Sequence, residues 1–318
     1  MAAALGNDFA ARVRRNERMS RHTSWHVGGP AELYFTPHDR ADLAAFVRSL
    51  PPETPVHWIG LGSNLLVRDG GLKGAVIALH GALERLERLD ATTVYSEAGV
   101  ACARIARQCI KWRLGPAEFF AGIPGTFGGA LAMNAGAFGG ETWRHVIGVE
   151  TLDRAGVEHG RACGEYEVSY RRVRAPVAGE GFLAARLRFE VRAGAAGTGP
   201  AGTGQRAAAD AAVRSLLERR KASQPIGAWS CGSVFTNPPG DHAARLIEAA
   251  GLKGFTIGDA SVSMKHANFI INHGAATATD IERLIEHVAA EVERVHGVRL
   301  EPEVRIVGEA VPVARGDA

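Results

Sequence analysis

Several common functional signatures are missing from this chain of 318 residues. Its four cysteines, Cys102, Cys109, Cys163 and Cys231, form no C-x-x-C pair and have no histidine beside them at zinc-finger spacing. A disulfide framework and a structural zinc site are therefore not expected, and the cysteine usage indicates a reducing cytoplasm. The chain also lacks an H-E-x-x-H motif and a carboxylate cluster, so no metal site is predicted.

Charge and hydrophobicity exclude two further classes. The chain has 37 basic and 34 acidic side chains, and its formal net charge is +3. This excess is too small for a strongly basic nucleic-acid binder but is compatible with an anionic small ligand. No run of about eighteen apolar residues occurs, and charges are spread through the first twenty residues, so neither a membrane span nor a signal peptide is predicted. We expect a cytoplasmic protein that binds neither nucleic acid nor membranes.

Glycine, in contrast, is abundant and concentrated in one stretch. Residues 121–137 read Ala-Gly-Ile-Pro-Gly-Thr-Phe-Gly-Gly-Ala-Leu-Ala-Met-Asn-Ala-Gly-Ala and contain no ionisable side chain. This pattern fits neither an amphipathic helix nor an alternating strand. Glycine allows a backbone to approach a ligand closely, and N–H groups in such turns can converge on an anion. The stretch predicts a bed for a flat, phosphorylated cofactor, with a structural Gly-rich turn as an equally good reading.

The hydrophobic pattern divides the chain into two α+β bodies. We predict a domain at 21–192 and a smaller one at 207–309, with a short helical or loose lead-in at 1–20, a Gly/Ala-rich linker at 193–206 and a tail at 310–318. The strongest helix prediction covers residues 280–296, where Thr279 and Glu282 match a capping box and an apolar stripe follows. Asp39 is predicted to cap a helix in the first domain, and the helix at 207–221 follows the linker.

A second Gly-rich loop, Gly60-Leu-Gly-Ser-Asn64, lies between short strands predicted at 56–59 and 65–67. The dinucleotide-binding fingerprint would need a third glycine where Leu65 stands, followed by a long helix, and the chain has no G-K-[ST] sequence. A Rossmann fold and a P-loop are therefore rejected. The loop N–H groups, with the Ser63 hydroxyl and the Asn64 amide, would suit a diphosphate.

Three polar residues are candidates that are weak when taken singly. Ser233 lies in Cys231-Gly-Ser-Val-Phe-Thr-Asn237, which is not a G-x-S-x-G nucleophile elbow, and a turn serine is the ordinary explanation. Arg171 follows Tyr170 near a strand end, where an arginine is usually solvated. Glu303 lies in an alternating terminal strand, which usually turns such charges to water.

The order of these motifs closely resembles the UDP-N-acetylenolpyruvoylglucosamine reductase family. The resemblance runs from about residue 20 to residue 309 and rests on five motifs in order. They are Gly60-x-Gly-Ser-Asn64, Ala121-Gly-Ile-Pro-Gly-Thr-x-Gly-Gly-Ala-x-x-Met-Asn-Ala-Gly136, Tyr170-Arg171, Gly232-Ser233-x-Phe-x-Asn-Pro238 and Glu303-Val-Arg-x-x-Gly308.

The resemblance implies an FAD-binding domain of the vanillyl-alcohol-oxidase (PCMH) class and a smaller substrate-binding domain. It implies a monomeric UDP-N-acetylmuramate dehydrogenase, which uses NADPH to reduce the enolpyruvyl ether of UDP-N-acetylglucosamine during peptidoglycan synthesis. The FAD should be non-covalent, because the loop that holds His or Cys in covalent members has Ser63-Asn64 here. The implied FAD-binding residues are Gly60, Gly62, Ser63, Asn64, Gly122, Ile123, Pro124, Gly125, Gly128, Gly129, Asn134 and Ala135.

The resemblance also implies roles for polar side chains. Arg171 would bind the substrate carboxylate, and Ser233 would donate a proton to the carbon that bears this carboxylate. Glu303 could help only as a protonated donor or through a water, since a second anion would repel the developing charge. Lys221, which is twelve residues before Ser233, and Asn237 would bind the UDP diphosphate, with Arg305 in the same polar network. An exposed lysine at a helix end remains the alternative for Lys221.

One family type carries an inserted lid with a tyrosine that closes over the substrate. The tract at 193–204 has no tyrosine and no room for a folded lid, so we expect the shorter, lidless type. Two other functions remain open from the sequence. One is another FAD oxidoreductase of the same fold, and the other is a non-catalytic module that binds a nucleotide-sugar or a flavin.

Overall fold

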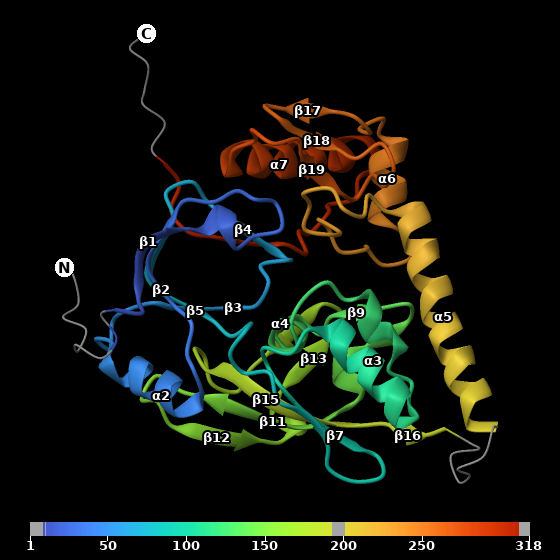
Figure 1. Cartoon of the computed structure of the whole chain (residues 1–318). Coiled ribbons are helices and arrows are strands. Elements are labelled where there is room, and N and C mark those ends of the chain that lie inside the picture. Colours follow the sequence, from blue (N-terminus) through green and yellow to red (C-terminus); the bar gives the residue numbers. More distant parts are fainter. Residues whose placement is uncertain (1–8, 10, 193–200, 312–318) are drawn as a thin grey trace. The chain divides into compact units, whose positions relative to one another are not determined.

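The computed structural model describes residues 9, 11–192 and 201–311 and contains two compact units (Figure 1). Unit 1 consists of residues 1–13, 35–60 and 77–222, and unit 2 of residues 14–34, 61–76 and 223–318. Each unit has its own hydrophobic core. The core of unit 1 lies around Ile105 and Phe127, and the core of unit 2 around Trp25 and Leu284.

An antiparallel five-stranded sheet with the order β12-β11-β15-β7-β6 forms the centre of unit 1. Its strands are β6 (Leu86–Arg88), β7 (Thr93–Glu97), β11 (Val146–Leu152), β12 (Glu158–Arg161) and β15 (Gly181–Arg188). Helices α3 (Cys102–Trp112) and α4 (Phe127–Met133) cover one face of this sheet (Figure 1). Side chains that recur at helical spacing along α3, such as Ile105 and Cys109, are fully buried there, which explains this packing.

Two further helices belong to unit 1. Helix α2 (Arg40–Ser49) begins after Asp39, whose carboxylate accepts a hydrogen bond from the Asp42 N–H group, and this confirms the predicted cap. Helix α5 covers Ala201–Ser223. The short elements are β3 (Val56–Ile59), β8 (Leu114–Gly115), η2 (Glu118–Gly122), β9 (Gly136–Ala137), β10 (Gly140–Glu141), η3 (Thr142–Arg144), η4 (Cys163–Glu165), β13 (Glu167–Ser169), β14 (Arg172–Arg174) and β16 (Glu190–Val191).

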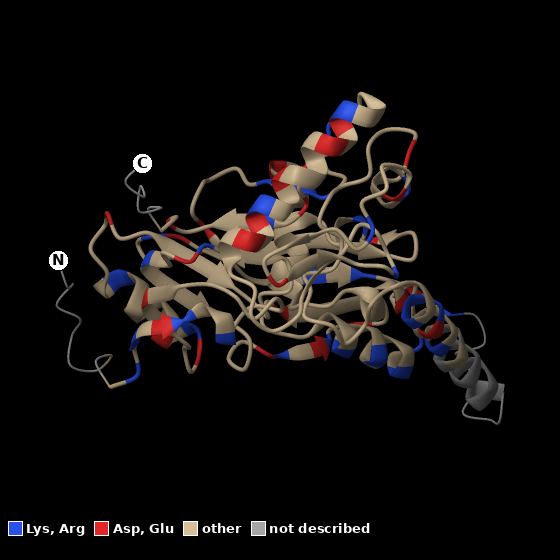
Figure 2. Ribbon diagram, turned by 90° about the horizontal axis from the view of Figure 1, so that it is seen from above, with Lys and Arg blue, Asp and Glu red and all other residues tan. Residues whose placement is uncertain are grey.

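Unit 2 is built around helix α7 (Ala278–His296), whose apolar stripe is buried. Its other elements are β1 (Arg14–Arg18), η1 (Met19–Arg21), β2 (Pro30–Phe35), β4 (Leu65–Val67), β5 (Leu72–Ala78), α6 (Ala243–Ala249), β17 (Thr256–Ile257), β18 (Ala260–Val262), β19 (Ile270–Asn272) and β20 (Arg305–Val307). Strands β1 and β2 pair antiparallel, and β17, β18 and β19 form a three-stranded sheet in that order. Basic and acidic residues are interspersed along the described chain (Figure 2).

Three local predictions need correction. The lead-in was expected to be helical or loose, but β1 pairs with β2 because this edge offers an extended partner. Helix α5 begins at Ala201, inside the predicted linker, since alanine favours helix strongly enough to outweigh two glycines. Residues 193–200 lie outside the described residues. The capping box of α7 is Thr277 with Asp280 rather than Thr279 with Glu282. The Asp69 carboxylate accepts from the N–H groups of Ala278 and Thr279 instead.

The compact units differ from the continuous domains that the sequence suggested. Residues 14–34 and 61–76 join the C-terminal part of the chain, because β4 pairs in parallel with β20, with Leu65 opposite Arg305. Trp25 and Leu66 also belong to the same core as α7. The predicted domains at 21–192 and 207–309 are therefore not the compact units, and their boundaries stay a prediction.

Candidate active site

The Gly-rich stretch at 121–137 lies in unit 1 and is tied to the strand that precedes α3. At the start of α4, the Phe127 N–H group donates to the Val100 carbonyl and the Gly128 N–H group donates to the Ala98 carbonyl, both at 2.8 Å. Among the described residues, the Gly129 N–H group has no hydrogen-bond partner. Most N–H groups that could have formed an anion nest are therefore engaged within the protein, and Gly129 is the remaining donor at this helix start.

The glycines of the two loops serve close packing of the chain on itself. A side chain on Gly60 would overlap the Thr126 hydroxyl group, so the end of β3 and the Gly-rich stretch lie against each other. A side chain on Gly122 would overlap the Phe138 ring. Gly129 differs, because the nearest atom to an added Cβ would be 3.8 Å away. The result is an uncharged backbone surface that is not crowded at Gly129, which fits a flat cofactor that approaches the main chain.

A strained hairpin tip brings Arg171 to the end of this stretch. Strands β13 and β14 pair with Ser169 opposite Arg172, which leaves Tyr170 and Arg171 as a two-residue turn. Arg171 has a φ of 57°, in the left-handed region that residues other than glycine seldom adopt. Its Nη2 donates to the Gly136 carbonyl at 2.9 Å, and its guanidinium carbon is 5.4 Å from the Tyr170 ring centroid.

Asn134 holds the same hairpin at a second point. Its Nδ2 donates to the Ser169 carbonyl at 3.1 Å, and its Oδ1 accepts from the Trp143 N–H group at 3.1 Å. The Asn134 side chain is buried, and its backbone is also left-handed, with a φ of 48°. Unit 1 therefore brings together Gly60, the Gly-rich stretch and Arg171.

Helix α5 presents a different cation from the one that the sequence singled out. Lys221 is exposed, whereas Arg220 is half-buried and its Nη1 donates to the Gly122 carbonyl. Burial lowers the pKa of the Arg220 guanidinium. Sequence reasoning missed Arg220. Neighbouring residues of a helix point about 100° apart. The number of residues to Ser233 therefore could not show whether the Arg220 or the Lys221 side chain is directed toward the rest of unit 1.

In unit 2, three chain segments bring the Ser233 loop and Glu303 together. The Glu303 N–H group donates to the carbonyl of Val234, the residue after Ser233, at 2.7 Å. Asn64 joins them, because its Nδ2 donates to the Glu303 carbonyl at 3.1 Å and its carbonyl accepts from the Arg305 N–H group at 3.2 Å. The backbone thus fixes Asn64, Ser233 and Glu303 as one group.

The remaining predicted residues of unit 2 occupy simpler positions. Gly62 has a φ of 61°, and a side chain there would overlap the His22 carbonyl. The Asn237 Oδ1 accepts from the Ala243 N–H group at 3.1 Å and so caps the start of α6. The Arg305 side chain is exposed, and Ser63 is half-buried.

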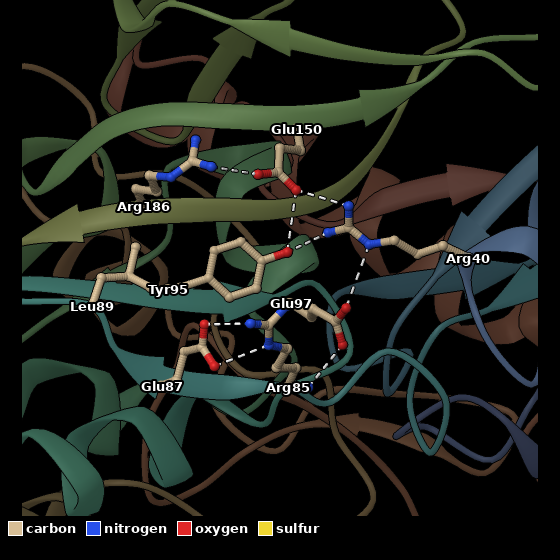
Figure 3. Close-up of a pocket in the computed structure, with 8 residues that line it drawn as sticks. All are labelled: Arg40, Arg85, Glu87, Leu89, Tyr95, Glu97, Glu150 and Arg186. Atoms are coloured by element: carbon tan, nitrogen blue, oxygen red, sulfur yellow. Dashed lines mark hydrogen bonds and ion pairs between the residues drawn. The ribbon is translucent and has the colours of Figure 1, made fainter.

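The pocket in Figure 3 contains none of these residues. It has a volume of about 360 Å³ and is lined by Arg40, Arg85, Glu87, Leu89, Tyr95, Glu97, Glu150 and Arg186 (Figure 3). Its three arginines and three glutamates pair with one another; for example, Arg40 Nη1 is 2.8 Å from the Glu150 carboxylate. Burial raises the pKa of the Tyr95 phenol to about 12. This charge-balanced network braces α2 against the sheet and is a poor site for an ionic ligand.

The described part of the chain offers neither a metal site nor a membrane-spanning helix. No group of three His, Cys, Asp or Glu residues there could hold a metal ion. None of the helices there has the length and apolar character needed to cross a membrane.

Comparison with known families defines the class of the protein. Residues 31–159 match the family model described as an FAD binding domain. Residues 224–307 match the model described as the C-terminal domain of UDP-N-acetylenolpyruvoylglucosamine reductase. An FAD-binding domain followed by this C-terminal domain defines a flavin-dependent reductase, and the expected α+β fold is confirmed.

Full-length relatives identify the family. The chain is 58% identical over 310 residues to the UDP-N-acetylenolpyruvoylglucosamine reductase of Alkalilimnicola ehrlichii, covering 98% of this chain and 99% of the relative. It is 54% identical to that of Methylococcus capsulatus, with 93% of each chain covered. The crystal structure of the Thermus caldophilus reductase (MurB) matches with a TM-score of 0.76 and 30% identity, over 93% of this chain and 98% of that one.

The chain therefore belongs to the UDP-N-acetylenolpyruvoylglucosamine reductase family. It is an oxidoreductase of peptidoglycan precursor synthesis that uses FAD, with NADPH as the reductant. These matches confirm the resemblance and the cofactors that were expected from the motifs. Both alternative functions are set aside, because the relatives are reductases along nearly the whole chain.

Proposed function

We propose that Arg171, Ser233 and Glu303 carry out the family reaction in this chain, the reduction of the enolpyruvyl ether of UDP-N-acetylglucosamine to UDP-N-acetylmuramate. The observation that carries the proposal is the placement of Arg171. The structure holds this cation in a strained conformation at the end of a stretch that has no charge of its own. Backbone strain of this kind is often found at functional sites.

Arg171 binds the carboxylate of the substrate. Reduction of the vinyl group places negative charge on the neighbouring carbon, and this charge spreads into the carboxylate. A planar guanidinium can meet a carboxylate with two hydrogen bonds, which lysine cannot match. The bond from Arg171 Nη2 to the Gly136 carbonyl orients the side chain before substrate arrives. Such preorganisation is what stabilises developing charge most effectively.

The Gly-rich surface of unit 1 and the loop that begins at Gly60 hold the FAD, which supplies hydride chemistry when it is bound. The absence of ionisable side chains from 121–137 and the uncrowded position at Gly129 support this assignment. The residues proposed to hold it are Gly60, Gly62, Ser63, Asn64, Gly122, Ile123, Pro124, Gly125, Gly128, Gly129, Asn134 and Ala135. Of these, Asn134 acts mainly by fixing the hairpin that carries Arg171.

Ser233 donates the proton to the carbon that bears the carboxylate. A serine hydroxyl is a weak acid, so it needs a neighbouring donor or cation. Glu303 is the nearest such candidate along the backbone, because its N–H group bonds to the residue after Ser233. In this role Glu303 is protonated or acts through a water, since an anion would oppose the charge that develops.

Lys221, Asn237 and Arg305 bind the nucleotide part of the substrate. Exposure of the Lys221 and Arg305 side chains is compatible with a role that needs access to ligand. Asn237 contributes through its amide, because its carbonyl oxygen caps α6. We further infer a lidless, monomeric enzyme in the cytoplasm, for which the support is the sequence resemblance.

Separating the two halves of the reaction tests this assignment. Ser233→Ala should still allow NADPH to bleach the flavin absorbance, but product formation should fall by about 10²- to 10⁴-fold, the usual loss for a positioned general acid. Ser230→Ala removes a nearby hydroxyl from the same loop and serves as the matched control. Normal turnover by Ser233→Ala would remove Ser233 from the mechanism.

A further inference from the structure

Two aromatic rings in unit 2 form an exposed pair outside the residues assigned above. The Trp229 indole is 42% exposed, and no other tryptophan in the described residues is so accessible. The His26 imidazole lies against it, with ring centroids 4.4 Å apart and an angle of 37° between the planes. His26 is also exposed. An accessible aromatic face of this kind can stack on a flat ligand.

The pair is held in place from both sides. His26 has a φ of 57° and lies in a turn closed by its own N–H group on the Thr23 carbonyl at 3.1 Å. Its chain neighbours, Trp25 and Val27, are buried in the core. The turn therefore holds the His26 side chain at the surface, in a left-handed backbone conformation that is strained for histidine and would not be strained for glycine.

Asn272 connects the two segments that carry the rings. This buried side chain donates from Nδ2 to the Trp25 carbonyl at 2.8 Å, next to His26. The Asn272 N–H group donates to the Trp229 carbonyl at 3.0 Å. One residue thus fixes both backbones, so the two rings form a built surface.

We propose that the His26–Trp229 pair is a stacking platform for the flat base of a nucleotide ligand. The proposal rests on the proposed function, since it assigns a subsite to that site. Trp229 is four residues before Ser233, so the two lie within about 14 Å of each other. A nucleotide places its base on the far side of a diphosphate from the reacting group. Both ligands of the family reaction carry such a base, which is uracil in the UDP-sugar and adenine in NADPH.

Stacking on an aromatic side chain is effective for any base, because every base has a π-face. Loss of one such contact corresponds to about 5- to 100-fold in affinity. The platform makes no contact with the reacting carbon, so it should act on binding and leave the rate at saturation nearly unchanged.

The test compares Trp229→Ala and Trp229→Phe in the full-length, FAD-loaded enzyme. Phe255→Ala is the matched control, because Phe255 is also exposed in unit 2 and stacks on His287 at 4.2 Å. Binding of UDP, NADP⁺ and pyrophosphate is measured by calorimetry, and kcat and KM by NADPH oxidation. We expect Trp229→Ala to weaken UDP or NADP⁺ by about 5- to 100-fold. Pyrophosphate affinity and kcat should stay within about twofold, and Trp229→Phe should restore most of the affinity.

The outcomes separate the possible ligands. Weaker UDP alone assigns uracil, and weaker NADP⁺ alone assigns a base of NADPH. Equal effects of Trp229→Ala and Phe255→Ala, or a loss that extends to pyrophosphate, would overturn the proposal. The wild-type turnover and the Ser233→Ala half-reactions test the proposed function independently of these affinities.

A second variant guards against a trivial loss of folding. His26→Gly removes the ring and relieves the left-handed strain, so the thermal midpoint should stay the same or rise while base affinity falls. A ring pair with a purely structural role would show the opposite, with a lower midpoint and unchanged affinity.

Discussion

The two units prepare their functional groups in different ways. In unit 1 the Gly-rich stretch has no ionisable side chain, and its glycines are required by contacts such as that between Gly60 and Thr126. In unit 2 the loops that carry Ser233 and Glu303 are fixed by backbone hydrogen bonds, and the proposed chemical groups are their hydroxyl and carboxyl side chains. Substitutions in unit 1 should therefore damage shape and cofactor retention, whereas those in unit 2 should damage proton transfer.

Arg171 is the exception that tests this division most strongly, because it is a chemical group in unit 1. Arg171→Lys keeps the charge but loses the planar fork, so product formation should fall by about 10²- to 10³-fold. Bound FAD should be unchanged, since Asn134 still holds the hairpin. Flavin content and turnover are the measurements, with Arg172→Lys as the control, because Arg172 is exposed on the next strand. Loss of FAD with retained turnover per flavin would make Arg171 a packing residue.

Gly60→Ala should destabilise unit 1 through steric overlap, without any change of charge. The new methyl group would overlap the Thr126 side chain, and overpacking of this kind costs about 1–3 kcal/mol. We expect a lower thermal midpoint and substoichiometric FAD after purification. Thr126→Ala in the same chain should restore part of both, and it removes no cap because the Thr126 side chain makes no capping bond to α4. Full FAD occupancy in Gly60→Ala alone would show that the two loops need not touch.

Local sequence patterns predicted much of the fold where cause and effect lie within a few residues. The cap at Asp39 and the strands at 56–59 and 65–67 depend on adjacent residues, and the structure confirms them. The capping box of α7 shows the limit of such patterns. Thr277 with Asp280 and Thr279 with Glu282 both suit the motif, and only the position of Asp69 explains how Thr279 is used instead.

The rest required information about distant partners. Nothing near Leu65 in the sequence indicates that this residue lies opposite Arg305. The combination of three separate chain segments in unit 2 could therefore not be predicted from the sequence. The strain at Arg171 was also hidden, because a Tyr-Arg turn lacks the glycine or asparagine that usually marks a positive φ. The resemblance supplied the candidate site, and the structure added the contacts that join Arg171 to Gly136 and Asn64 to Glu303.

Arg220 and Lys221 are neighbouring cations of α5 for which different effects on FAD retention are expected. Arg220→Ala removes a charged donor from the Gly122 carbonyl, which corresponds to about 1.5–3 kcal/mol. We expect reduced FAD retention and about tenfold weaker UDP-sugar binding. Lys221→Ala, on the same turn of α5, should leave FAD retention unchanged, because its side chain is exposed. Flavin content and KM are the measurements. Equal losses in both variants would indicate a general electrostatic effect of α5.

The smallest effect on turnover is expected at the pocket of Figure 3, which lies in unit 1 and contains none of the proposed site residues. The Tyr95 hydroxyl donates to Glu150 at 3.1 Å and accepts from Arg40. Tyr95→Phe should lower the free energy of unfolding by about 1 kcal/mol and change turnover by less than about twofold.

The pH dependence of that stability gives a sharper form of the same test. Burial raises the pKa of Tyr95 to about 12, whereas a tyrosine in an unfolded chain ionises near pH 10. The folded state therefore keeps a proton that the unfolded state loses. The contribution of Tyr95 to stability is complete below about pH 10 and is lost as the pH rises toward 12. Urea unfolding of the wild type and Tyr95→Phe should show a difference that is constant near neutral pH and shrinks above about pH 10. A tenfold loss of turnover in Tyr95→Phe would instead show that this network contributes to catalysis as well as to the stability of unit 1.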